Sequence, residues 1–139
     1  MSDNLILILA IVVFIFIFFA VIKSKIKVRS ILEDYEADLN PTNLNEFSQS
    51  GRGEVERELY GDGSAALKLR FSGTNLPEGS MVTLVVNSSK AGEFQVSEGR
   101  VYEKIETRSG KTVPSVKAGD TVEVLYDGTV VLSGTFYVD

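Results

Sequence analysis

Apolar and polar residues follow three different patterns along this chain. In the first pattern, residues 5–22 are apolar without a break and contain no charged residue, glycine or proline. A helix of this length is about 27 Å long, close to the thickness of a bilayer's hydrocarbon core. We therefore expect a helix buried in lipid or among copies of itself. The residues expected to make these contacts are Leu5, Leu9, Val12, Phe14, Phe16, Phe18, Phe19 and Ile22.

The second pattern is an apolar stripe at helical spacing after the unbroken run. Its members recur three or four residues apart, as on one face of an amphipathic helix. They are Val28, Ile31, Leu32, Tyr35 and Leu39. Asn40 precedes Pro41, which disfavours helical backbone at Asn40. The sequence thus predicts one long helix in residues 1–39, apolar all round in its first half and amphipathic in its second.

The third pattern is an alternation with period two, typical of half-buried strands. It follows a linker, residues 40–53, that is rich in Asn, Ser and Gly. Asp127-Gly128 between two apolar stretches is a hairpin signal. About seven strands with short turns predict an immunoglobulin-like antiparallel β-sandwich, or a small barrel, in residues 54–139. The predicted fold class is therefore a long N-terminal α-helix followed by an all-β domain.

Charge divides the chain at the same place as hydropathy. Residues beyond the apolar run include a basic cluster, Lys23, Lys25, Lys27 and Arg29. The net charge is −5, and the part from Ser30 onward carries −8, which argues against a nucleic-acid partner. A basic cluster beside an apolar run favours a membrane-surface role. Its position places the β domain in the cytoplasm if Met1 is the translation start, but this placement need not hold if a basic leader has been removed before Met1.

The residue inventory limits the chemistry. There is no Cys, His or Trp, so Ser-His-Asp and Cys-His catalysis and the usual zinc and copper sites are excluded. Glu54, Glu56 and Glu58 alternate and would share one strand face, where together with Asp62 they could ligate Ca²⁺. A solvated strand face is the interpretation we favour. We expect no catalytic residues, no metal, no cofactor and no enzyme activity.

The predicted architecture resembles that of type IV pilins and related filament subunits. The resemblance rests on the N-terminal helix, apolar and then amphipathic, that carries a small β domain. It implies that the apolar halves lie in the membrane before assembly and form the filament core afterwards. The acid usual at the fifth mature position is absent, because Leu5 stands there and the nearest acid is Asp3.

These patterns predict a structural subunit of a pilus-like extracellular filament. It would polymerise with copies of itself through the hydrophobic helix, with the β domains outside. It would be membrane-inserted before assembly and exposed at the cell surface afterwards. The alternative is a single-pass, membrane-anchored surface domain that binds a protein or a glycan.

Overall fold

The computed structural model describes residues 30–42, 47 and 50–139. This part of the chain forms nine strands and a single short 3₁₀ helix, η1. The elements are β1 (Ile31–Pro41), β2 (Arg52–Tyr60), β3 (Ala65–Ser72), β4 (Met81–Val86), β5 (Ser89–Gln95), β6 (Val101–Glu106), η1 (Thr107–Ser109), β7 (Thr121–Tyr126), β8 (Thr129–Thr135) and β9 (Tyr137–Val138).

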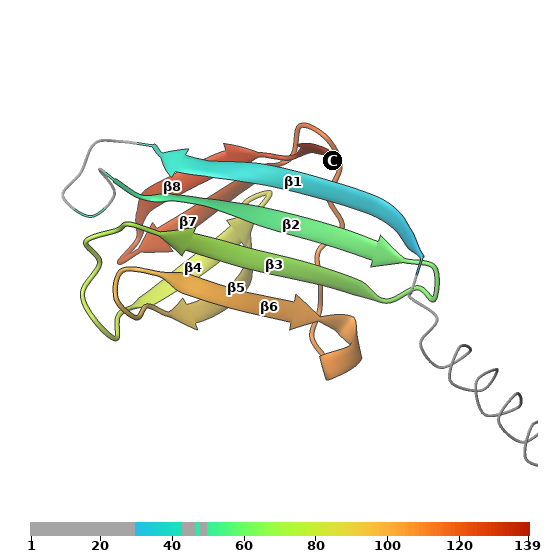
Figure 1. The fold of residues 1–139 in the computed structure, drawn as a ribbon, viewed down its shortest axis with the longest axis horizontal. Helices are drawn as coiled ribbons and strands as arrows, with labels where there is room; N and C mark the ends of the chain where they lie inside the picture. The colour runs from blue at the N-terminus through green and yellow to red at the C-terminus, as the bar shows by residue number, and fades with distance from the viewer. Residues whose placement is uncertain (1–29, 43–46, 48–49) are drawn as a thin grey trace, which may run out of the picture.

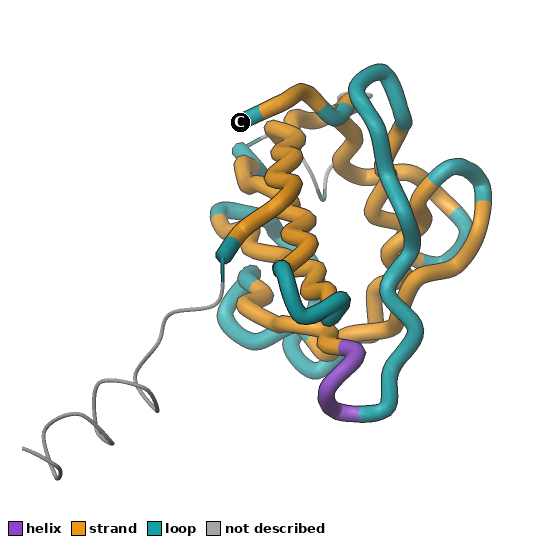
Figure 2. Tube along the Cα trace, turned by 90° about the vertical axis from the view of Figure 1, so that its right-hand side faces the viewer, coloured by secondary structure: helices purple, strands orange, loops and turns teal. Residues whose placement is uncertain are grey.

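All the strands belong to one antiparallel sheet, in the order β5-β4-β7-β8-β1-β2-β3-β6, with β9 added beside β1. The sheet curls so that β1-β2-β3-β6 forms one layer and β5-β4-β7-β8 lies behind it (Figure 1). The two layers are joined through β1, because Asn40 and Pro41 at its end pair with β8. Figure 2 shows the layers edge-on, with the long connection from η1 to β7 running along one side.

The hydrophobic core lies between the two layers. Every second residue of the long strands points inward, as the two-residue side-chain period of a strand requires. Val113 and Val116, in the connection from η1 to β7, pack against the same core. The largest fully buried side chains are Phe71, Phe136, Leu39, Leu67, Leu69, Leu84 and Leu132, together with several valines.

The predicted fold class is wrong for residues 31–39, which form strand β1 and not the second half of a helix. Ile31, Tyr35 and Leu39 are four residues apart, and this even spacing fits one face of a helix and one face of a strand equally well. Leu32 distinguishes the two, because it belongs to the helical stripe but lies on the opposite face of a strand. The backbone identifies the segment as a strand, because it pairs with β2 from Ile31 opposite Tyr60 to Leu39 opposite Gly53.

Two further parts of the prediction need correction. The immunoglobulin-like sandwich of about seven strands fits only in part, because the two layers belong to one hydrogen-bonded sheet of nine strands that includes β1, closer to the alternative of a small barrel. The predicted transmembrane helix is not found either: no helix within residues 30–42 and 50–139 is long and apolar enough to cross a membrane. The apolar run 5–22, the basic cluster 23–29 and Val28 of the stripe lie outside the described residues.

Candidate functional site: an acidic sheet face

Carboxylates lie directly opposite one another across β1 and β2. The register pairs Asp34 with Glu58, Glu36 with Glu56, and Asp38 with Glu54. Opposed residues in an antiparallel pair point to the same side of the sheet, with their Cβ atoms about 5 Å apart. We call this surface the acidic face. Its members are Asp34, Glu36, Asp38, Glu54, Glu56 and Glu58.

The core determines which side of the sheet is acidic. On β1 the side chains of Ala37 and Leu39 are buried, and on β2 the side chain of Val55 is buried. Because successive side chains alternate between the two faces, the even-numbered acids of both strands must point outward. The pairing register then brings acid opposite acid.

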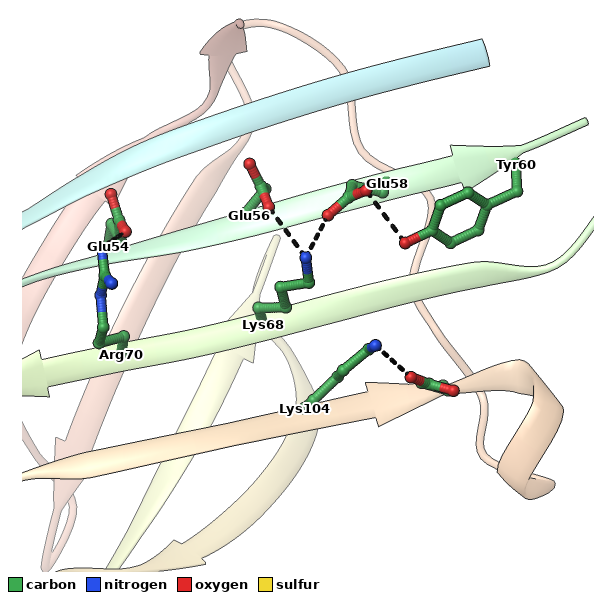
Figure 3. A network of polar contacts seen from close by, with 8 residues as sticks. Glu54, Glu56, Glu58, Tyr60, Lys68, Arg70 and Lys104 are labelled. Atoms are coloured by element: carbon green, nitrogen blue, oxygen red, sulfur yellow. Dashed lines mark hydrogen bonds and ion pairs between the residues drawn. The ribbon is translucent and has the colours of Figure 1, made fainter. Parts of the chain in front are cut away.

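Cations compensate only the β2 side of the acidic face. Lys68 of β3 places its Nζ 2.6 Å from Glu58 and 3.4 Å from Glu56 (Figure 3). Arg70 pairs with Glu54. Within the part of the chain that the structure describes, no lysine or arginine forms an ion pair with the three outward carboxylates of β1, Asp34, Glu36 and Asp38.

Crowding of the carboxylates changes their acidity. Burial, together with the charges of Asp139 and Glu58, raises the pKa of Asp34 above its ordinary value. Burial and Asp139 likewise raise the pKa of Glu36. The pKa of Glu56 is raised by burial and by Glu58. In all three residues the folded protein disfavours the charged form, first because the carboxylate is partly buried and second because like charges lie close to it.

Glu58 is the exception among these carboxylates. Its burial alone would raise its pKa, but hydrogen bonds from Lys68, Glu56 and Tyr60 outweigh this effect, and the net pKa is lowered. The hydroxyl of Tyr60 donates to the Glu58 carboxylate at 3.0 Å (Figure 3). Glu58 is thus an anchored carboxylate, held in its charged form, beside neighbours that are driven toward protonation.

A shallow groove of about 390 Å³ extends from the acidic face across β3 to β6. Lys68 and Arg70 form its middle, and Lys104 of β6, paired with Glu106, lies on the far side. Tyr102 is 77% exposed at this edge. The groove is therefore bordered by carboxylates along β2 and by mixed charges and an exposed ring along β6.

Two sets of three carboxylates are close enough to hold a cation. In each set one oxygen from every residue lies within 4.8 Å of the others. The sets are Asp34, Glu56 and Asp139, and Glu36, Asp38 and Glu54. Carboxylate oxygens suit hard cations such as Ca²⁺ and Mg²⁺. Exposed acids often gather without an ion, so these sets describe the charge of the surface and do not define a metal centre.

The predicted amphipathic stripe does not form a common packing surface. Ile31 and Leu32 are exposed at the start of β1, Tyr35 is half-buried and Leu39 is in the core. Glu54, Glu56 and Glu58 do share one strand face. Asp62, considered with them as a calcium ligand, instead accepts hydrogen bonds from Ser64 and pairs with Arg108.

The helix predicted for residues 1–39 gave no role to the three acids of β1. Asp34, Glu36 and Asp38 alternate with Tyr35, Ala37 and Leu39 at period two. That alternation is a strand signal and could have revealed the acidic face.

Neither a protein-family model nor a curated protein matches this chain.

Proposed function

We propose that this protein is a non-catalytic binding domain attached to a membrane, and that its acidic face recognises a basic segment of a partner protein. The observation that carries the proposal is the acid-against-acid register of β1 and β2. Like charges directly opposite in a sheet destabilise it. A cationic partner would remove this repulsion on binding, so the electrostatic cost of the free state would favour the complex.

The distribution of cations supports a partner that binds over β1. Lys68 and Arg70 neutralise part of β2, whereas Asp34, Glu36 and Asp38 have no cation paired with them in the described structure. Lysine or arginine side chains of a partner would find their strongest attraction there. Complementary charge of this kind accelerates association and gives a strong dependence on salt.

The start of β1 supports attachment close to a lipid surface. Only residues 23–30 lie between the apolar run and Ile31, and eight residues span at most about 28 Å. Ile31, Leu32 and Val138 are exposed apolar residues that border one shallow pocket at this end of the sheet. A domain tethered in this way through residues 5–22 would stay within a few nanometres of the membrane.

The binding proposal is tested with the full chain in detergent micelles, titrated with an oligolysine peptide by calorimetry. The double variant Glu36→Gln/Glu54→Gln removes two charges from the acidic face. The control Glu123→Gln/Asp127→Asn removes the same charge from the other layer. We expect at least tenfold weaker binding for the first variant only. Equal binding by both variants, or no binding by the unmodified chain, would contradict the proposal.

Attachment is tested by fractionating cells that produce the full chain. Phe16→Asp puts a charge into the apolar run, which costs about 3 kcal/mol or more at the centre of a bilayer. We expect the unmodified chain in the membrane pellet after alkaline washing, and the variant in the supernatant. If both chains stay in the pellet, residues 5–22 are not the attachment.

Assembly into a pilus-like filament stays a prediction. The long helix on which it was based does not continue through residues 31–39. Electron microscopy of material sheared from the cells, with mass spectrometry of the same fraction, tests it. Filaments that contain the chain with residues 5–22 retained would support it, and their absence would leave the membrane-attached domain.

A further inference from the structure

The sheet contains an internal repeat that the sequence does not reveal. Hairpin β4–β5 and hairpin β7–β8 are equivalent at a constant offset of 40 residues, and every paired position in one hairpin has its counterpart in the other. Both hairpins have a bulge at the same place, after Leu84 and after Val124. Across the repeats, from residue 76 to 96 and from 116 to 136, only two aligned positions carry the same residue, Gly79/Gly119 and Val82/Val122.

The two hairpins are related by a local two-fold axis. β4 and β7 pair antiparallel, with Leu84 directly opposite its own counterpart Val124. The turns before the hairpins repeat as well: Gly79 N–H donates to the Val96 carbonyl, and Gly119 N–H donates to the Phe136 carbonyl, both at 2.9 Å. The outer strands β5 and β8 are therefore equivalent edges of one symmetric four-stranded layer.

Only one of these equivalent edges is hydrogen-bonded to a strand of the other layer. Asn40 and Pro41 of β1 pair with Ser133 and Leu132 of β8. The corresponding positions of β5 are Glu93 and Gly92, and β5 pairs with β4 alone in the described sheet. A groove of about 440 Å³ runs beside β5, between it and β6. β6 approaches β5 across this groove without hydrogen-bonding to it, so the outer edge of β5 has no strand partner in the described sheet.

A strand that crosses between the layers, as β1 does beside β8, cannot lie beside β5 in the same way. β1 passes against Gly134, where an added Cβ would lie 2.2 Å from the Asp38 carbonyl oxygen. The counterpart of Gly134 in β5 is Phe94, whose side chain packs against the core. A bulky side chain thus stands at the position equivalent to the one where glycine lets β1 pass close to β8. A crossing like that of β1 at Gly134 is therefore blocked at Phe94.

The charges on β5 are self-complementary. The bulge omits Ala91 from the pairing with β4, so Lys90 and Glu93 emerge on the same side, with their charged atoms 2.8 Å apart. Both are at least half exposed. In an antiparallel pairing of two β5 strands, a two-fold axis between Ala91 and Gly92 would set Lys90 of each copy opposite Glu93 of the other. Opposite charges facing across strands stabilise the pair.

We propose that β5 is a self-association edge, through which two copies of this chain pair antiparallel and join their sheets. Exposed edge strands present unpaired backbone groups that favour such pairing. Attachment to a membrane, as in the function proposed above, would raise the local concentration of the domains and favour association of copies side by side. The acidic face lies on the other layer, so partner binding and self-association use different surfaces.

The test reverses the charges on β5 and measures dimerisation. The method is sedimentation equilibrium of the full chain in detergent micelles at low ionic strength. Lys90→Glu and Glu93→Lys each leave only like charges on β5, and we expect each alone to dimerise at least tenfold more weakly than the unmodified chain. An equimolar mixture of the two should recover the dimer, because opposite charges again meet across the interface. The internal ion pair is absent in both variants, so recovery reports contacts between copies.

The matched control exchanges another exposed ion pair, Arg100 with Glu98, through Arg100→Glu and Glu98→Lys. These variants should dimerise as the unmodified chain does, and circular dichroism checks that all the variants are folded. A monomeric unmodified chain, or Lys90→Glu that dimerises unchanged, overturns the proposal. The second result would place the association in residues 5–22.

A crosslinking measurement tests the register independently. The chain has no native cysteine, so introduced thiols report single contacts. A mixture of Lys90→Cys and Glu93→Cys chains should form a disulfide-linked dimer under mild oxidation, more than either chain alone. Absence of this crosslink in a dimer that responds to the charge exchange would overturn the antiparallel β5 register.

Discussion

Lys68 of β3 reaches across to β2 and places its Nζ 2.6 Å from the buried carboxylate of Glu58. The same ammonium lies 3.4 Å from Glu56, and Tyr60 donates a hydrogen bond to Glu58 from the other side. This arrangement raises the pKa of Lys68, chiefly through its hydrogen bond to Glu58. Lys68 thereby holds the charge of the one acidic-face residue that is almost inaccessible to water, since Glu58 is 5% exposed.

Lys68→Met should destabilise the domain by about 1–3 kcal/mol, because it leaves Glu58 as a buried charge without its cation. Chemical denaturation at neutral pH measures the change. The double variant Lys68→Met/Glu58→Gln should recover most of the loss, since no buried charge remains. Arg100→Met, which breaks an exposed pair, serves as the control and should cost less than about 0.5 kcal/mol. Equal losses for the two single variants would contradict this account.

Stability should rise as the pH is lowered from 7 to about 5. Asp34, Glu36 and Glu56 have raised pKa values in the folded protein, so the folded state binds more protons than the unfolded state in this range. At lower pH the trend should reverse, because Glu58 and Asp62 have lowered pKa values and their stabilising charges are lost there. Thermal unfolding measured at about ten pH values between 3 and 8 would locate the pH of maximum stability. A melting temperature that falls steadily from pH 7 to 5 would be inconsistent with crowded carboxylates.

Glu36→Gln should stabilise the isolated domain at neutral pH by a few tenths to about 1 kcal/mol. Glu36 lies opposite Glu56, and the substitution removes the repulsion but keeps the size of the side chain. Glu123→Gln is the matched control, because Glu123 lies opposite Ser133 and should change little. A loss of stability with Glu36→Gln would mean that its charge is compensated in the free protein.

Gly134→Ala should destabilise the fold by about 1–3 kcal/mol or more, through overpacking at the junction of the two layers. The added Cβ would lie 2.2 Å from the backbone oxygen of Asp38, which neither strand can relieve without moving. Gly61→Ala is the control, since its Cβ would meet Ser30 at an ordinary 3.5 Å. Hydrogen exchange should show lost protection of two backbone amides, that of Asn40 and that of Leu132, which pairs with Pro41. Unchanged stability would place β1 and β8 farther apart than described.

Much of the strand pattern can be recognised in the sequence, because it depends on residues that are close together along the chain. Residues 67–71 alternate clearly between apolar and polar, and β3 forms there, while the valine-rich residues 82–86 form β4. Asp127-Gly128 marks the turn between β7 and β8, with Asp127 at φ 50° and Gly128 at φ 76°. Such features depend on side chains a few positions apart, so they can be predicted without knowing which strands pair.

The second half of the predicted helix shows where local patterning is ambiguous. Tyr35 and Leu39 are spaced to suit a helix or a strand, and the acids between them suit a solvated face of either. Pairing with β2 along almost its whole length makes β1 a strand, because the sheet satisfies its backbone and buries Ala37 and Leu39. That stabilisation comes from residues more than a dozen positions away.

The candidate site, too, could be predicted only in part from the sequence. Alternation in residues 54–58 already specifies that Glu54, Glu56 and Glu58 share one face, since the side-chain period of a strand is two. Their opposition to the acids of β1 depends on the pairing register, and a shift of one residue would turn β1 over. The repeat of β4–β5 in β7–β8 likewise emerges only in three dimensions, because backbone pairing and bulge position are retained while the side chains differ. Local periodicity thus specifies the strands and their faces, whereas long-range pairing brings the carboxylates together and leaves the outer edge of β5 unpaired.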